Sequence, residues 1–212
     1  MSLPVLVLGA GGHAKVLIDA LLASCAVIAG IVDPDPRLAG TDLLGVPVLG
    51  GDDLVGEFPP SEVLLVNGLG SVGAPVGRRR LFERFKEMGY SFASVVHPSA
   101  VVAADVELGE GAQIMAGAVI QPGSRIGCNA IINTRASVDH DCLVGAHVHI
   151  APGVTLSGGV TVGEASHLGT GATVIQGRRI GAESVIGAGA LVLNDVAPAV
   201  TVVGVPARMV ER

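Results

Sequence analysis

An aliphatic residue recurs at every sixth position from residue 102 to residue 192, and this spacing restricts the fold more than any other feature of the chain. A period of six fits neither an amphipathic helix nor the simple alternation of a strand. It is the signature of a hexapeptide-repeat β-helix, a solenoid whose three-hexad coils stack as parallel strands. We therefore expect a solenoid of about five coils. The repeating positions are Val102, Leu108, Ile114, Ile120, Ile126, Ile132, Val138, Val144, Ile150, Leu156, Val162, Leu168, Val174, Ile180, Ile186 and Val192.

The composition suits narrow coils and argues against a membrane protein. Hydrophobic residues make up 50% of the chain, but aromatic residues only 2%, and tryptophan is absent. No apolar run approaches the roughly 18 residues that a membrane-spanning helix needs. The N-terminus also lacks the basic, apolar and small-residue pattern of a signal peptide. We therefore predict a soluble cytoplasmic protein with no membrane partner.

Charge and cysteine content exclude two further classes of protein. The net charge is −6 and basic residues are few, which argues against a nucleic-acid partner. The three cysteines, Cys25, Cys128 and Cys142, are widely spaced and form no CxxC pair. We expect buried free thiols, with neither disulfides nor a zinc site.

The chain begins with the pattern of a nucleotide-binding unit. Val5–Leu8 is predicted to be a buried strand, Gly9 to His13 a glycine-rich turn, and residues 14–23 a helix, as in a Rossmann-like βαβ unit. Glycines let backbone amides approach a phosphate, and the N-terminus of a helix favours an anion. Asp33 ends the second predicted strand, where a carboxylate could meet a ribose hydroxyl. The full GxGxxG pattern is not met, so a tight turn that requires glycine is the plain alternative.

The rest of the first half completes a small α/β domain. Strands are predicted at residues 46–49, 62–66 and 92–95, with Asp52 or Asp53 capping a short helix and a second glycine-rich loop beginning at Asn67. Residues 75–88 form a predicted amphipathic helix. Its buried face would carry Leu81, Phe82 and Phe85, and its exposed face Arg78, Arg79, Glu83 and Lys86. We place the α/β domain at 1–96 and the solenoid at 97–212, with a terminal cap over 203–208.

One hexad of the solenoid is unusually polar. Asp139, His140 and Asp141 are consecutive, and one coil later the column of His140 holds Gly158, which leaves space above the ring. A carboxylate beside an imidazole orients it and raises its basicity, as a general base requires. A solvated surface histidine is the alternative. Zinc sites between trimeric β-helices use two histidines about five residues apart plus a third from another coil. The spacings here are seven and two, so no metal is predicted.

Five sequence motifs together resemble the bacterial nucleotide-sugar acetyltransferases. They are GAGGHAKV at 9–16, HPSAVV at 97–102, NTRASVDHDC at 133–142, HIAPG at 149–153 and VGVPAR at 203–208. The group includes UDP-4-amino-sugar N-acetyltransferases, GDP-perosamine N-acetyltransferase and sialic-acid O-acetyltransferases. The resemblance covers essentially the whole chain, and the motif at 133–142 is the most specific part of it.

The resemblance implies a fold, an assembly and a cosubstrate. The fold would be a Rossmann-like nucleotide-sugar-binding domain followed by a left-handed parallel β-helix. The assembly would be a homotrimer with acetyl-CoA bound between neighbouring subunits. His140 would be the general base and Asp141 its carboxylate partner. The residues placed by the resemblance at the nucleotide sugar are Gly11, Gly12, His13, Asp33, Asn67 and Asn133. Those placed at acetyl-CoA are His149, Gly158, Gly187, Ala188, Pro206 and Arg208.

The predicted reaction is direct transfer of an acetyl group to the amine of a nucleotide-activated 4-amino-4,6-dideoxy sugar, in a pathway of glycan biosynthesis. A backbone amide would stabilise the thioester oxyanion. Three alternatives stay open. They are a sialic-acid-type O-acetyltransferase, a non-catalytic protein that binds a nucleotide sugar, and a metal enzyme resembling carbonic anhydrase.

Overall fold

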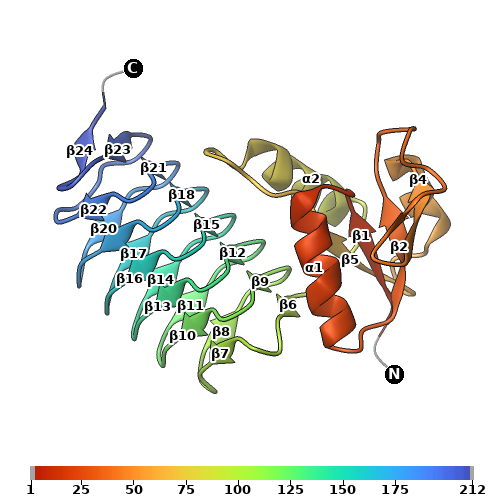
Figure 1. The fold of residues 1–212 in the computed structure, drawn as a ribbon, viewed down its shortest axis with the longest axis horizontal. Helices are drawn as coiled ribbons and strands as arrows, with labels where there is room; N and C mark the ends of the chain where they lie inside the picture. The colour runs from red at the N-terminus through yellow and green to blue at the C-terminus, as the bar shows by residue number, and fades with distance from the viewer. Residues whose placement is uncertain (1–2, 211–212) are drawn as a thin grey trace.

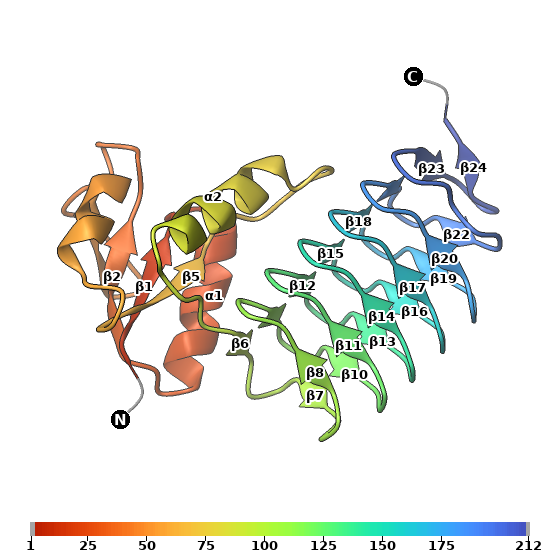
Figure 2. The ribbon, with the colours of Figure 1, turned by 180° about the vertical axis from the view of Figure 1, so that it is seen from behind.

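The chain folds into an α/β part and a left-handed parallel β-helix that stand side by side (Figures 1 and 2). The structure, a computed structural model, describes residues 3–210. Within that range, no helix combines the length and the apolarity needed to cross a membrane.

The α/β part is built on a five-stranded sheet in the order β3-β4-β2-β1-β5. Its strands are β1 (Val5–Leu8), β2 (Ile28–Val32), β3 (Asp42–Leu43), β4 (Val46–Gly50) and β5 (Leu64–Asn67). All pairs are parallel except β3 with β4. Alternate residues of β1 face opposite sides of the sheet. Val5 and Val7 pack with helix α1 (Gly12–Ala23), whereas Leu6 and Leu8 pack with helix α2 (Val76–Glu87) and the 3₁₀ helix η1 (Asp52–Glu57).

The β-helix has three flat faces built from two-residue strands in parallel ladders, except at the end of the third face, where Thr201–Val203 and Arg208–Met209 pair antiparallel. The first face contains β7 (Val101–Val102), β10 (Val119–Ile120), β13 (Ser137–Val138), β16 (Thr155–Leu156), β19 (Thr173–Val174) and β22 (Leu191–Val192). The second contains β8 (Glu107–Leu108), β11 (Arg125–Ile126), β14 (Leu143–Val144), β17 (Thr161–Val162) and β20 (Arg179–Ile180). The third contains β6 (Val95–Val96), β9 (Gln113–Ile114), β12 (Ile131–Ile132), β15 (His149–Ile150), β18 (His167–Leu168), β21 (Val185–Ile186), β23 (Thr201–Val203) and β24 (Arg208–Met209).

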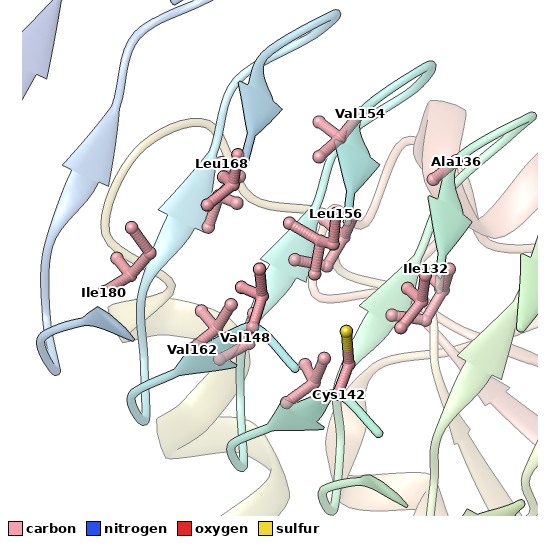
Figure 3. Packing of buried hydrophobic residues seen from close by; sticks show 14 of the residues in the cluster. Ile132, Ala136, Cys142, Val148, Val154, Leu156, Val162, Leu168 and Ile180 are labelled. Carbon is pink, nitrogen blue, oxygen red and sulfur yellow. The ribbon is translucent and has the colours of Figure 1, made fainter. Parts of the chain in front are cut away.

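The six-residue period is what closes these coils. Ser137 pairs with Val119 and Thr155, so each coil advances the chain by three hexads. The aliphatic residue of each hexad points inward and stacks on its equivalent one coil away (Figure 3). The preceding residue points outward. The side chains on the outside of each face are therefore set by the position before each aliphatic residue.

The two parts meet along the third face and the corner between the second and third faces. Arg78 of α2 is only 2% exposed. Its guanidinium donates to the carbonyls of Asn67 and Leu69 at 2.8 Å and to that of Asn129 at 3.3 Å. Burial lowers the pKa of Arg78 to about 9, and its hydrogen-bond acceptors are all neutral carbonyls. The sequence prediction that Arg78 is exposed is wrong, because α2 packs on the solenoid as well as on the sheet.

Three smaller predictions also need correction. The strand expected at 92–95 is divided, since Phe92 bridges to Leu65 of the α/β sheet and Val95–Val96 joins the third face of the β-helix. Neither Asp52 nor Asp53 caps η1, whose N-cap residue is Gly51. Cys25 is exposed rather than buried, because it occupies a left-handed turn after α1. The domain division at residue 96 stays a prediction.

Candidate active site

A cavity of about 680 Å³ lies between the two parts and gathers most of the residues expected at the nucleotide sugar. The glycine-rich turn before α1 forms one wall, the loop after β5 forms another, and the third face of the β-helix forms the floor. The lining residues are Gly9, Gly11, Gly12, His13, Val16, Asp33, Pro34, Gly68, Leu69, Gly70, Ser71, Val72, Asn133 and His149.

His13 connects the glycine-rich turn to the floor of this cavity. Its Nε2 lies 2.8 Å from Oε1 of Gln113, whose own amide donates to the carbonyl of Asn67 at 2.8 Å. Burial, followed by the nearby charge of Arg78, lowers the pKa of His13 to about 4. His13 is therefore neutral at physiological pH. It can donate a hydrogen bond through Nε2 to Gln113 and keep Nδ1 as an acceptor.

The surroundings of His149 fix its tautomer. Its Nδ1 lies 3.0 Å from the carbonyl oxygen of Ser71, so Nδ1 must carry the proton. Its Nε2 then accepts from the amide of Asn133 at 3.1 Å, and the Asn133 oxygen accepts the backbone N–H of Thr134 at 2.7 Å. The pKa of His149 is lowered to about 3, mainly by burial and next by the nearby His167. The centroids of the two imidazole rings are 4.9 Å apart, in an edge-on arrangement. His149 is thus a neutral residue of the cavity floor, and its hydrogen bond to Ser71 connects the floor to the loop after β5.

Two predicted substrate residues differ in their access to the cavity. Asp33 lies in the wall, where its carboxylate accepts the backbone N–H groups of Ala10 at 2.7 Å and Asp35 at 2.9 Å. Asn67 is 1% exposed and lies behind the wall. Its amide donates to the carbonyl of Arg78 and to the side-chain oxygen of Asn129. Asn67 therefore shapes the loop and is not placed to touch a ligand.

The predicted base lies at a different corner, between the first and second faces. Nδ1 of His140 is 2.8 Å from Oδ2 of Asp141, and the backbone N–H of His140 donates to Oδ1 of Asp139 at 2.8 Å. The hydrogen bond to Asp141 is the main reason that the pKa of His140 is raised. With Nδ1 engaged by a carboxylate, Nε2 is the nitrogen left to accept a proton.

Gly158 provides the space above this ring, as the sequence predicted. A Cβ atom at Gly158 would stand 2.6 Å from Cε1 of His140, closer than any real contact allows. Its position one coil above His140 is confirmed by the hydrogen bond from the N–H of Gly159 to the carbonyl of His140 at 2.8 Å. Among the described residues, the N–H of Gly158 has no backbone partner. A free N–H beside a histidine is the arrangement that an oxyanion site needs.

The remaining predicted residues follow the corner between the third and first faces. Asn133, Ala151, Gly169 and Gly187 occupy equivalent places in successive coils, as the register of β12, β15, β18 and β21 shows. Ala188 follows Gly187 and is exposed. Pro206 and Arg208 lie in the exposed tail that caps the last coil, where β24 pairs with β23. A track of small residues therefore runs from the cavity towards the tail.

Within one chain, the cavity residues and the residues around His140 form two separate groups. They lie at the two edges of the first face. A second cavity of about 620 Å³, between the start of α2 and the upper coils, contains none of the predicted residues. Within residues 3–210, no group of three or more His, Cys, Asp or Glu side chains is arranged to hold a metal ion.

Comparison with known proteins identifies the family. Residues 4–85 match the PglD N-terminal domain, and residues 123–158 match the bacterial transferase hexapeptide family of six repeats. A histidine-to-asparagine variant of perosamine N-acetyltransferase from Caulobacter crescentus, in complex with CoA and GDP-perosamine, is 43% identical with a TM-score of 0.91. It covers 99% of this chain and 97% of its own. The chain belongs to the bacterial nucleotide-sugar acetyltransferases.

Two further structures support this assignment. The acetyltransferase domain of PglB from Neisseria gonorrhoeae, in complex with acetyl coenzyme A, is 37% identical, with 98% of each chain covered and a TM-score of 0.90. WeeI from Acinetobacter baumannii is 28% identical, covers 99% of this chain and 100% of its own, and has a TM-score of 0.86. As a member of the nucleotide-sugar acetyltransferases, the chain is an acetyl-CoA-dependent acyltransferase with a sugar substrate.

Sequence reasoning missed three residues that build the acetyltransferase cavity. Gln113 occupies an outward position of the third face and joins His13 to the loop. Ser71 holds His149 from the loop side. Arg78 clamps the same loop from α2. Gln113 could have been noticed as a polar residue in an outward position next to the first domain. Ser71 and Arg78 gave no such signal.

Proposed function

We propose that this acetyltransferase moves an acetyl group from acetyl-CoA to the amine of a nucleotide-linked 4-amino-4,6-dideoxy sugar, with His140 as general base. The observation that carries the proposal is the His140–Asp141 pair facing Gly158 at one edge of the first face, with the interdomain cavity at the other edge. Each edge supplies what the other lacks, a base and an amide at one and a sugar-nucleotide pocket at the other.

The charge on the three faces supports a trimer that joins these edges. The outward residues of the first face carry no charge, whereas the second face presents Glu107, Arg125 and Arg179, and the third face is largely covered by the α/β part. A flat uncharged ladder favours self-association. If three chains turn their first faces towards a common axis, the cavity edge of each adjoins the His140 edge of its neighbour. The outward residues of the first face are Val101, Val119, Ser137, Thr155, Thr173 and Leu191.

The nucleotide and the cosubstrate then have separate places. The phosphates would lie at Gly11 and Gly12, where α1 begins and no side chain crowds the backbone. Asp33 and Asn133 would border the nucleoside and the sugar. Acetyl-CoA would follow the small-residue track past Gly187 and Ala188, between two subunits, with its other end near Pro206 and Arg208. His149 would stand where the sugar pocket meets this track.

The chemistry proceeds by direct transfer. The sugar amine attacks the thioester carbonyl carbon while Nε2 of His140 takes the proton that the nitrogen loses. The Asp141 carboxylate stabilises the resulting imidazolium by accepting the hydrogen bond from Nδ1. The N–H of Gly158 donates to the oxyanion of the tetrahedral intermediate. When the intermediate collapses, the carbon–sulfur bond breaks, and the departing CoA sulfur recovers the proton from His140.

The decisive experiment follows CoA release as free thiol. The purified protein is given acetyl-CoA with UDP-, GDP- or dTDP-linked 4-amino sugars, or with a sialic acid. Release with an amino sugar supports the proposal. Release with the sialic acid alone would instead make the protein an O-acetyltransferase. Stabilisation by a nucleotide sugar with no CoA release from any acceptor would make it a binding protein.

The His140→Asn variant tests the base. General-base catalysis contributes about 10²–10⁴-fold, so kcat should fall by that amount while the oligomer stays intact in size-exclusion chromatography. His97→Asn is the matched control, because His97 lies at the first coil and, among the described residues, its side chain bonds only to Ser99. If His140→Asn turned over like the wild type, His140 would not be the base.

A further inference from the structure

The peptide between Ser157 and Gly158 has a direction that matters for the proposed reaction. In a trans peptide the C=O and the following N–H point in opposite directions. The N–H of Gly158 can therefore point outward, beside His140, only while the carbonyl of Ser157 points into the coil. A hydrogen-bond donor inside the coil can hold the carbonyl in that direction.

Cys142 provides that group. Its Sγ lies 3.3 Å from the carbonyl oxygen of Ser157, and its side chain is fully buried among the aliphatic residues of the core (Figure 3). A thiol donates only when protonated. Burial raises the pKa of Cys142, which keeps it in that form. Cys142 is thus a buried donor aimed at the carbonyl that controls the direction of the Gly158 N–H.

Ser124 has the same role one coil below. Its Oγ donates to the carbonyl of Asp139 at 2.8 Å and accepts the backbone N–H of Cys142 at 3.0 Å. These two bonds hold both ends of the turn that carries His140 and Asp141. Ser124 is fully buried, so solvent does not compete for them.

We propose that Ser124 and Cys142 are positioning residues for acetyl transfer, Ser124 setting the turn that carries the His140 base and Cys142 aiming the Gly158 amide at the oxyanion. The proposal rests on the proposed function. Cys142 would contribute to catalysis by orienting the Gly158 amide, and its sulfur would form no covalent intermediate.

The fold itself does not require these donors. The same inward position of hexads that precede the first and third faces holds alanine, at Ala112, Ala118, Ala130, Ala136, Ala172 and Ala190, all of them buried in the same core. Ser166 provides the matched comparison, since its Oγ donates to the carbonyl of Gly181 at 2.8 Å with the same sequence separation as Ser124 and Asp139. The Gly181 corner lies between the second and third faces, away from His140.

The test compares Cys142→Ala with Ser166→Ala. Cys142→Ala loses one buried hydrogen bond to a corner carbonyl. Ser166→Ala loses the equivalent bond and also the one that Ser166 accepts from the N–H of Ser184, so it is the more severe change to the fold, and both variants should fold. In Cys142→Ala we expect kcat to fall by roughly 10–100-fold, with the KM for the nucleotide sugar unchanged, because an amide stabilising the transition state is misaligned. The pH dependence of kcat/KM should not move. Ser166→Ala should keep its kcat.

The conservative variant completes the comparison. Cys142→Ser should restore most of the activity, because serine at the equivalent positions 124 and 166 reaches its carbonyl at 2.8 Å. Ser124→Ala should lower kcat and also shift the pH dependence, because the turn that pairs His140 with Asp141 is loosened. Equal kcat values for Cys142→Ala and Ser166→Ala in an active enzyme would overturn the inference and leave the proposed function standing.

A structural measurement is independent of activity. Crystal structures of the wild type and of Cys142→Ala show the direction of the Ser157 carbonyl directly. We expect the carbonyl to rotate or to become disordered in the variant. An unchanged carbonyl would overturn the inference, whereas a wild-type protein that releases no CoA would overturn the proposed function.

Discussion

The Nδ1 atom of His140 lies 2.8 Å from Oδ2 of Asp141, the next residue along the chain. Adjacent residues rarely bring their side chains together. They do so here because Asp141 has a left-handed backbone, with φ of 59°, at the corner of the coil. The same conformation is held by glycine at most corners, for example Gly123 and Gly159. The carboxylate thus occupies a position that favours glycine and gains a hydrogen bond to the imidazole.

Asp141→Asn should move the acid limb of the pH profile. The hydrogen bond to Asp141 raises the pKa of His140, so its removal lowers that pKa. A general base works when deprotonated, and the fall of kcat/KM with decreasing pH should therefore shift to lower pH. The maximal rate should also drop, by about tenfold or more, because the imidazolium loses its partner. Asp139→Asn is the control and should give a smaller shift in the same direction. A profile that does not move would contradict the pairing.

Gly158→Ala should remove activity with little loss of stability. The φ of Gly158 lies outside the left-handed region, so alanine adds no backbone strain there, and the atoms nearest to its methyl group belong to the His140 ring, which is displaced. The neighbouring variant Gly159→Ala should have the opposite effect, a loss of stability with turnover retained. Gly159 has open space but φ of 68°, so alanine there should cost about 1 kcal/mol in free energy of unfolding. Turnover and urea unfolding of both variants check this, and equal turnover losses would contradict the role of Gly158.

Thr155→Arg should break the oligomer. Thr155 points outward from the uncharged first face, where three added guanidinium groups would repel one another across the proposed axis. Thr161→Arg places the same charge on the second face, which already carries Arg125 and Arg179. Sedimentation should show smaller species for the first variant alone. Loss of activity should accompany dissociation, since the proposed site takes the cavity and His140 from different subunits. A fully active monomer would contradict this arrangement.

The solenoid could be predicted almost completely, and the docking of the first domain could not. A six-residue period fixes which side chains point inward, so the place of Gly158 above His140 follows by counting. The position of Arg78 does not, because a helical pattern reports one buried face and α2 has two. The prediction for Asn67 was wrong for a related reason, since its burial depends on how the loop after β5 packs against α2 and the solenoid.

Arg78→Met should test the joint between the two parts. It removes the side-chain donors to the carbonyls of Leu69 and Asn129 and one of the two donors to the carbonyl of Asn67, which keeps the amide of Gln113. The loss should be at least about 3 kcal/mol in free energy of unfolding, since a hydrogen bond to a charged group contributes about 1.5–3 kcal/mol and Arg78 bonds to three carbonyls. Arg80→Met, at an exposed position two residues on, is the control. Nucleotide-sugar binding should weaken with Arg78→Met, because the clamped loop lines the cavity. Equal stability of the two variants would contradict the role of Arg78.

Stability should fall in mild acid because of the buried histidines. The folded-state pKa is about 4 for His13 and about 3 for His149, both below the ordinary 6.5. Between pH 6.5 and about 4 the unfolded chain therefore binds protons that the folded chain excludes. Each histidine then removes up to about 1.4 kcal/mol of stability per pH unit, and the full stability is present only above pH 6.5. His149→Gln should flatten this dependence in urea unfolding at fixed protein concentration, whereas a variant at the half-buried His97 of the first coil should not. An equally steep loss in His149→Gln would show that His149 titrates normally and that its tautomer is not fixed by Ser71.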